Sequence, residues 1–143
     1  MKKRAISVIL IAAMVLASVL ALCSCGSNED KDDAVIVHPI SITMSIDYPD
    51  KSKIPDLVNE SFKVEEDSTA FDAIQIYGAV NSVPILVETT GSTVEGINGV
   101  KNGDMGKRVW QFKINGKLYT GSPDDIKLKA NDSLEWFYKP VQK

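Results

Sequence analysis

The dipeptide Asn115-Gly116 stands between two runs of residues in which apolar and polar side chains alternate. Both central positions of a two-residue type I′ turn need a positive φ, which asparagine and glycine adopt more readily than other residues. The dipeptide therefore predicts a tight antiparallel hairpin, in which Ile114 pairs with Lys117 and Phe112 pairs with Tyr119. Similar alternation at 42–48 and 133–138, and a shorter run around Phe62 and Val64, predict further half-buried strands.

One segment, 69–80, is predicted to be a helix. Asp67, Ser68 or Thr69 can cap its first turn, and Asp72 lies three residues after Thr69, as in a capping box. Strands are also expected at 83–90, at 93–97 and around Ile126 and Leu128. One face of the helix is apolar and predicts packing on a sheet, with Ala70, Phe71, Ile74, Tyr77 and Gly78 on it. We therefore expect an α+β fold, a small β-grasp-like domain with one helix packed on antiparallel β hairpins.

Residues 1–24 are predicted to be a lipoprotein signal peptide. Three basic residues precede a long apolar run, which is typical of an export signal. The end of this run, with Leu22 and Ser24 before Cys25, resembles the lipobox of bacterial lipoproteins. That resemblance implies cleavage before Cys25 and a diacylglyceryl group on its sulfur, which would anchor the protein at the extracytoplasmic face of the cell membrane. The alternative is an uncleaved anchor helix, for which the apolar run is short.

After the signal peptide, residues 25–37 are expected to be the lipidated cysteine and a flexible tether, because the polar stretch GSNEDKDD has no apolar side chain to bury. Residues 38–143 then form one domain of ordinary size, which we expect to be a monomer. Without the three basic residues of the signal, 13 basic residues face 19 acidic ones, a net charge of −6. Such an acidic domain is a poor candidate for binding nucleic acid.

The sequence offers little for catalysis or for metal binding. His38 is its only histidine, and both cysteines lie at the end of the signal, so a nucleophile would depend on His38 as its base. A zinc site would have to rely on carboxylates, and neither Asp104 nor Asp124 lies in the spacing of a calcium loop. We therefore expect no enzyme, no cofactor and no metal site. A hydrolase with paired carboxylates is the least favoured alternative, because no pair is marked by its spacing.

The loop Gly103-Asp-Met-Gly-Lys-Arg108 superficially resembles a phosphate-binding loop. Such a loop needs a glycine five positions before the Gly-Lys pair and a serine or threonine after it. This chain has Lys101 and Arg108 at those positions, and a strand instead of a helix follows. We therefore interpret the glycines as turn residues that lead the chain into the strand of Trp110, and the loop as the rim of a binding site.

Aromatic residues are concentrated in the last third of the chain. Most of them are expected in the core, but Trp136, Phe137 and Tyr138 are adjacent and cannot all point to one face of a strand. An exposed aromatic side chain could contact a flat ligand or a peptide, and an open sheet edge could add a partner strand. As candidate ligand contacts on this aromatic surface and the neighbouring loop 98–107, we select Asn98, Asn102, Trp110, Tyr119 and Phe137.

Four segments share an order with a known family: 68–74 at the helix start, 97–100, 110–116 with its aromatic residues and Asn-Gly turn, and 131–138 at the end. In this order the chain resembles the DUF4430 family, a domain of unknown function related to the C-terminal domain of transcobalamin. The closing turn departs from the family's Asp-Gly-Asp.

The resemblance implies a small β-rich binding module, which in the transcobalamin relatives contacts one side of a corrinoid. We therefore expect a lipid-anchored, extracytoplasmic and non-enzymatic binding module that contacts a small ligand through its aromatic surface, with a corrinoid as one candidate. The alternative is a structural or adhesion-type module that binds another protein of the cell envelope.

Overall fold

The structure is a computed structural model and describes residues 38–141. The predicted signal peptide, Cys25 and the tether lie outside the described residues, so the predicted anchor is not tested. Within the described range, no helix is long and apolar enough to cross a membrane.

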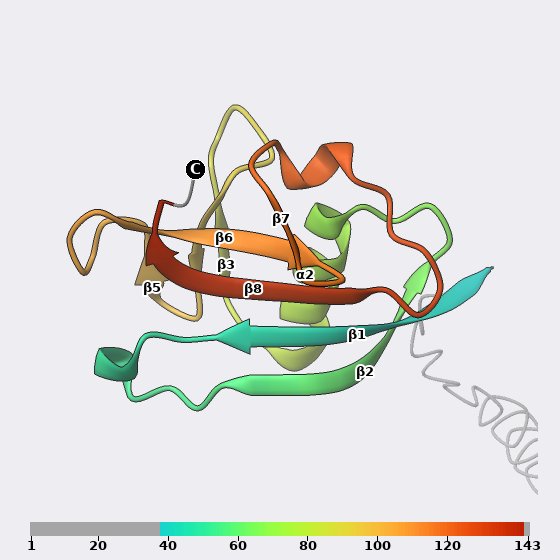
Figure 1. Cartoon of the computed structure of the whole chain (residues 1–143), viewed down its shortest axis with the longest axis horizontal. Helices are drawn as coiled ribbons and strands as arrows, with labels where there is room; N and C mark the ends of the chain where they lie inside the picture. The colour runs from blue at the N-terminus through green and yellow to red at the C-terminus, as the bar shows by residue number, and fades with distance from the viewer. Residues whose placement is uncertain (1–37, 142–143) are drawn as a thin grey trace, which may run out of the picture. The chain divides into compact units, whose positions relative to one another are not determined.

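Five strands form the main sheet in the order β2-β1-β8-β6-β7 (Figure 1). The strands are β1 (Pro39–Asp47), β2 (Leu57–Glu65), β6 (Arg108–Ile114), β7 (Lys117–Tyr119) and β8 (Ser133–Pro140). The first and last strands, β1 and β8, are parallel at the centre of the sheet, and the other pairs are antiparallel. This arrangement confirms the predicted α+β, β-grasp-like class.

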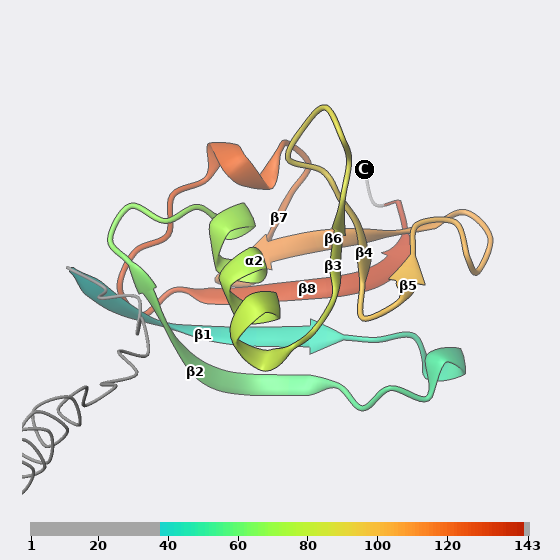
Figure 2. The same ribbon diagram turned by 180° about the vertical axis from the view of Figure 1, so that it is seen from behind.

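A helix and a smaller sheet cover one face of the main sheet. The helix is α2 (Ala70–Asn81), and the small antiparallel sheet contains β3 (Ile85–Val87), β4 (Val94–Ile97) and β5 (Val100–Lys101). Figure 2 shows both in front of the main sheet. Two short 3-10 helices, η1 (Asp50–Ser52) and η2 (Pro123–Asp125), lie in the connections.

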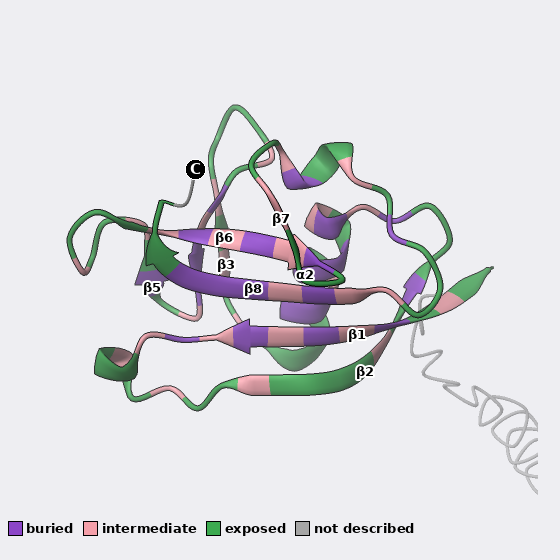
Figure 3. Ribbon diagram, viewed as in Figure 1, coloured by how far each residue is buried: buried purple, intermediate pink, exposed green. Residues whose placement is uncertain are grey.

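The hydrophobic core lies between α2 and the main sheet. Along β1, the buried Ile42, Met44 and Ile46 alternate with partly exposed polar residues, as the period of two predicts. Ile74 of α2 and Leu134 of β8 are fully buried against them. Figure 3 shows the same alternation along the central strands.

The predicted capping box begins α2. The Thr69 side chain accepts a hydrogen bond from the Asp72 N–H at 3.1 Å, and the Asp72 carboxylate accepts one from the Thr69 N–H at 2.8 Å. The helix ends when Ser82 takes a left-handed conformation with φ 56°. Local hydrogen bonds therefore determine both ends of this helix.

The Asn115-Gly116 hairpin is also confirmed. Both residues have positive φ, 52° and 76°, as a type I′ turn requires. Ile114 pairs with Lys117 and Phe112 with Tyr119, and the Phe112 and Tyr119 rings stack with centroids 5.9 Å apart.

Three sequence expectations differ from the structure. The segment around Ile126 and Leu128 forms only an isolated antiparallel bridge between Lys127 and Thr69 instead of a full strand, with the Leu128 N–H donating to the Ser68 carbonyl. The strand expected at 83–90 is only β3, and the loop expected at 98–107 contains β5. The expected fold of antiparallel hairpins also does not include the parallel pairing of β1 with β8. No local pattern in either strand specifies a partner so distant in sequence.

Candidate functional site

Strand β7 is shorter than β6, and this difference opens a pocket. β7 pairs only with Phe112, Lys113 and Ile114, so the first half of β6 has no strand beyond it on that side among the described residues. The space holds a cavity of about 430 Å³ between β6, the start of β4 and the segment that follows β7. We call this cavity the aromatic pocket; its walls include Trp110, Phe112, Tyr119 and Trp136, with Thr93 and Ser122 supplying hydroxyl groups.

The aromatic side chains of this pocket are held by one another. The Phe112 ring lies 5.2 Å from the Trp136 ring and stacks on Tyr119. Trp136 and Phe112 are buried, whereas Tyr119 is partly exposed. Tyr119 is therefore the aromatic wall most available to a ligand, and the other rings form a rigid base.

Trp136 carries the one buried side-chain polar atom that lacks a hydrogen-bond partner within residues 38–141, its indole Nε1. The Nε1 of Trp110, in contrast, donates to the Val100 carbonyl at 2.8 Å. A buried N–H without an acceptor costs about 1–3 kcal/mol, so such groups are rare in folded proteins. Trp136 is also one of the residues that line the aromatic pocket, so the unpaired donor belongs to a side chain of the pocket wall.

Two of the five predicted ligand contacts, Trp110 and Tyr119, are brought together at this pocket. Asn98, Asn102 and Phe137 are not among its lining residues. Asn98 has φ 51° in the turn between β4 and β5, and its side chain is hydrogen-bonded to Tyr48. Burial raises the pKa of Tyr48, and the bond to Asn98 opposes that shift.

Asn102 joins the small sheet to the open edge of β6. Its side-chain oxygen accepts a hydrogen bond from the Trp110 N–H at 2.8 Å, and its nitrogen donates to the Val94 carbonyl at 3.2 Å. The side chain thus takes the place of the strand that β6 lacks at this point. Asn102 positions Trp110 and Val94, two residues of the pocket wall, without lining the pocket.

Replacing Asn102 with alanine is expected to lower the free energy of unfolding by about 1–3 kcal/mol, because the backbone groups of Trp110 and Val94 lose their partner. The matched variant Asn102→Asp keeps the acceptor for Trp110 and loses only the donor to Val94, so its loss should be smaller. Urea denaturation followed by circular dichroism measures both. Equal stability of the alanine variant and the parent protein would contradict this role.

Phe137 lies on the opposite face of the sheet from Trp136 and Tyr138, as the adjacency of the three residues predicts. Although no helix covers this face among the described residues, Phe137 is 0% exposed. The ammonium groups of Lys113 and Lys139 lie 4.5 and 5.8 Å from its ring centroid. The expectation of an exposed aromatic contact is therefore wrong at Phe137, because neighbouring lysine side chains cover the ring.

Sequence reasoning missed part of the pocket. Phe112 and Trp136 lie in the core, as expected of most of the aromatic residues, but they also line the pocket, and Thr93 and Ser122 carry no sequence signal. The one available signal is the Thr-Gly-Ser stretch at 120–122, whose composition favours a loop and so predicts an early end of β7.

The family model of the Domain of unknown function (DUF4430) matches residues 67–140, more than half of the chain. This protein belongs to the DUF4430 family. The match begins at the residue before Ser68 and ends in β8, so it includes the helix, the small sheet and all four aromatic walls of the pocket. No curated protein sequence matches the chain.

Two solved structures share the fold. The structure of haptocorrin in complex with Cbi superposes with a TM-score of 0.57 at 14% identity and covers 73% of this chain. The chain spans about a quarter of haptocorrin, 26% of its length. A proposed metal-binding protein from Ruminococcus gnavus superposes with a TM-score of 0.50 at 16% identity, covering 72% of this chain and 99% of its own. At these identities, the similarity shows a common fold.

Within residues 38–141, no group of three or more histidine, cysteine, aspartate or glutamate side chains is placed to hold a metal ion.

Proposed function

We propose that this DUF4430 protein is a non-enzymatic binding module that holds a small ligand in the aromatic pocket. The observation that supports the proposal most directly is the unpaired, buried Nε1 of Trp136 on a pocket-lining residue. The cavity volume, about 430 Å³, lies in the range of small-molecule sites. Such a ligand would place an apolar or flat body against Tyr119 and a hydrogen-bond acceptor at Trp136.

A corrinoid is the first ligand to test. The fold is shared with haptocorrin, whose structure contains Cbi. Corrinoids also have the two properties that the pocket requires, a flat ring system and peripheral amide carbonyls that accept hydrogen bonds. A ring of that size would enter the pocket at one edge and extend beyond it.

The test is a titration of the full-length protein in detergent with cobinamide and cobalamin, followed by tryptophan fluorescence. Both tryptophans of the sequence line the aromatic pocket, so a bound ligand changes the fluorescence directly. Free tryptophan, titrated in parallel, corrects for light absorbed by the corrinoid. We expect saturable quenching and a rise in the melting temperature. No response at millimolar corrinoid would rule out this ligand.

The variant Trp136→Phe separates pocket binding from other contacts. It keeps an aromatic ring and removes the indole donor, so affinity should fall about tenfold, the value of one lost hydrogen bond to a buried group. The matched control is Val58→Ala, because Val58 is 71% exposed on β2, away from the pocket. Equal affinity of Trp136→Phe and the parent protein would contradict binding at this donor.

A protein-interaction function is the second candidate, and the edge strand β2 favours it. β2 is nine residues long and ends the main sheet, so one of its edges has no partner strand in the described structure. Such an edge can add a strand from another protein. Cross-linking in envelope fractions should then capture a partner protein. The variant Glu60→Pro, which disrupts the edge of β2, should lose this partner, whereas the variant Trp136→Phe should retain it.

The proposal also places the protein at the membrane through a lipid on Cys25. The basis is the signal-like sequence alone. Cys25→Ser should release the protein from the membrane fraction, while retention of this variant would favour an uncleaved anchor helix.

A further inference from the structure

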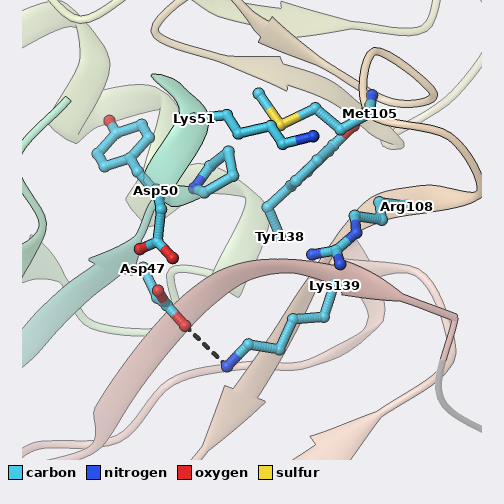
Figure 4. Close-up of a pocket in the computed structure, with 9 residues that line it drawn as sticks. Asp47, Asp50, Lys51, Met105, Arg108, Tyr138 and Lys139 are labelled. Carbon is cyan, nitrogen blue, oxygen red and sulfur yellow. Dashed lines mark hydrogen bonds and ion pairs between the residues drawn. The ribbon is translucent and has the colours of Figure 1, made fainter. Parts of the chain in front are cut away.

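A second cavity lies at the end of the main sheet where β1 and β8 terminate. Its volume is about 450 Å³. One wall comes from η1 and the residues just before it, and the other comes from the loop 102–107 and the start of β6 (Figure 4). We call this cavity the charged cleft. It shares no lining residue with the aromatic pocket.

Three cationic side chains line the charged cleft, Lys51, Arg108 and Lys139, together with Asp47 and Asp50. Asp47 is already paired, because its carboxylate lies 2.9 Å from the Lys139 Nζ. The hydrogen bond from Lys139 to Asp47 raises the pKa of Lys139, so this pair stays ionised and satisfied. The pair contributes no net charge to the cleft.

Arg108 and Lys51 have no ion-pair partner among residues 38–141. Figure 4 shows the two side chains extending from opposite walls, with Tyr138 between them and Met105 beside Lys51. Only Asp50 remains to balance their two positive charges. The cleft is therefore cationic, although the mature chain carries net negative charge.

The walls of the cleft are held in place before any ligand arrives. The Tyr138 hydroxyl donates to the Lys101 carbonyl at 2.9 Å and accepts from the Met105 N–H at 3.3 Å, which ties the loop 102–107 to β8. On the other wall, the Tyr48 N–H donates to the Asp56 carboxylate at 2.8 Å. A fixed cleft loses little conformational entropy when it binds a ligand.

We propose that the charged cleft binds a small organic anion, whose carboxylate or phosphate lies between Arg108 and Lys51 and whose apolar part packs on Met105 and Tyr138. The guanidinium of Arg108 can donate two parallel hydrogen bonds to either group. The loop 103–108, which lacks the signature of a nucleotide-binding loop, thus supplies an anion contact through a side chain instead of through its backbone. This site is independent of the aromatic pocket and of the proposed function.

The test is isothermal titration calorimetry on the full-length protein in detergent with four probes. Phenyl phosphate and benzoate combine an anion with an apolar ring, inorganic phosphate lacks the ring, and benzylamine has the opposite charge. We expect one of the two aromatic anions to bind more tightly than inorganic phosphate, and benzylamine not to bind. The stronger of the two identifies the group as phosphate or carboxylate. Binding of none of the anions at millimolar concentration, or stronger binding of benzylamine, would overturn the proposal.

Two variants assign the binding to this cleft. Arg108→Gln and Lys51→Gln should each weaken the binding of the better anion about tenfold, because each loses a charge-assisted hydrogen bond. The matched control is Lys63→Gln, which removes an exposed lysine of β2 outside the cleft. Trp136→Phe, which tests the aromatic pocket, should also leave the affinity unchanged. Equal losses in Lys63→Gln and Arg108→Gln would indicate unspecific attraction and contradict the site.

Discussion

Replacing Phe137 with alanine is expected to lower the free energy of unfolding by about 3–5 kcal/mol, the range for large aromatic side chains in a core. Phe137 lies on the sheet face that faces away from α2, where a loss this large would be unusual for a surface residue. The side chain is nevertheless 0% exposed, because Lys113 and Lys139 cover its ring. Each lysine is itself fixed by an acidic partner, Glu135 and Asp47 respectively.

Urea denaturation measures this effect, with Val58→Ala as its control. Val58 is 71% exposed on the edge strand β2, so its replacement should change stability by less than about 0.5 kcal/mol. The variant Lys113→Ala tests separately how much the lysine side chain over the Phe137 ring contributes. It should lower the free energy of unfolding by about 1 kcal/mol, since it removes one cation–π contact and part of the packing. A loss below about 1 kcal/mol in Phe137→Ala would mean that Phe137 is not a structural residue, and would restore it as a ligand contact.

The second large effect is expected for Gly78→Ala in α2. In a solvent-exposed helix this change would stabilise the protein by about 1 kcal/mol, because alanine is the better helix former. Here an added Cβ would lie 2.5 Å from Cγ1 of Ile85 and 2.6 Å from the Val83 carbonyl oxygen. The Ile85 side chain can rotate, but the carbonyl belongs to the backbone that connects α2 to β3. The steric cost should therefore outweigh the helix preference, with a net loss of about 3 kcal/mol.

The control for this variant is Gly91→Ala. Gly91 lies in the exposed turn between β3 and β4, and the nearest atom to an added Cβ is the end of the Glu88 side chain, 3.8 Å away. Its replacement should leave the melting temperature within a few degrees of the parent, whereas Gly78→Ala should lower it clearly. Calorimetry on both variants decides the point. Similar melting temperatures for the two would show that α2 can move away from β3 without cost.

Together, Phe137 and Gly78 show that the two faces of the main sheet are stabilised by different means. On the α2 face, the helix packs so closely against Val83 and Ile85 that there is no room for even one methyl group at Gly78. On the other face, a single aromatic ring is covered by charged side chains that are themselves paired. This second arrangement leaves the open face polar while it still buries a large aromatic side chain.

The sequence predicted elements whose cause is local. The capping box needs only Thr69 and Asp72, the hairpin needs only Asn115-Gly116 and its flanking pairs, and the buried face of β1 follows from its alternation. Each of these depends on residues a few positions apart, so the signal survives without knowledge of the rest of the fold.

The site was predicted in part, for the same reason. Trp110 and Tyr119 were selected as aromatic residues near a hairpin and do line one pocket. Asn102 was selected as a loop residue that contacts ligand, but both ends of its amide are used by Trp110 and Val94. Whether an asparagine in this loop contacts a ligand or hydrogen-bonds to a strand edge depends on how β4 packs against β6. The residues next to Asn102 in the sequence do not specify that packing.

The amino-acid sequence by itself determined one helix, the hairpin, the buried faces of the strands and an aromatic-rich final third. Hydrogen bonding and burial within a short segment specify each of these features. Only the tertiary structure decided that β1 and β8 pair in parallel, that β7 ends early enough to open the aromatic pocket, and that Lys113 and Lys139 cover Phe137. These features depend on contacts between segments distant in sequence. They are stabilised by the packing of the whole core, which no local sequence pattern specifies.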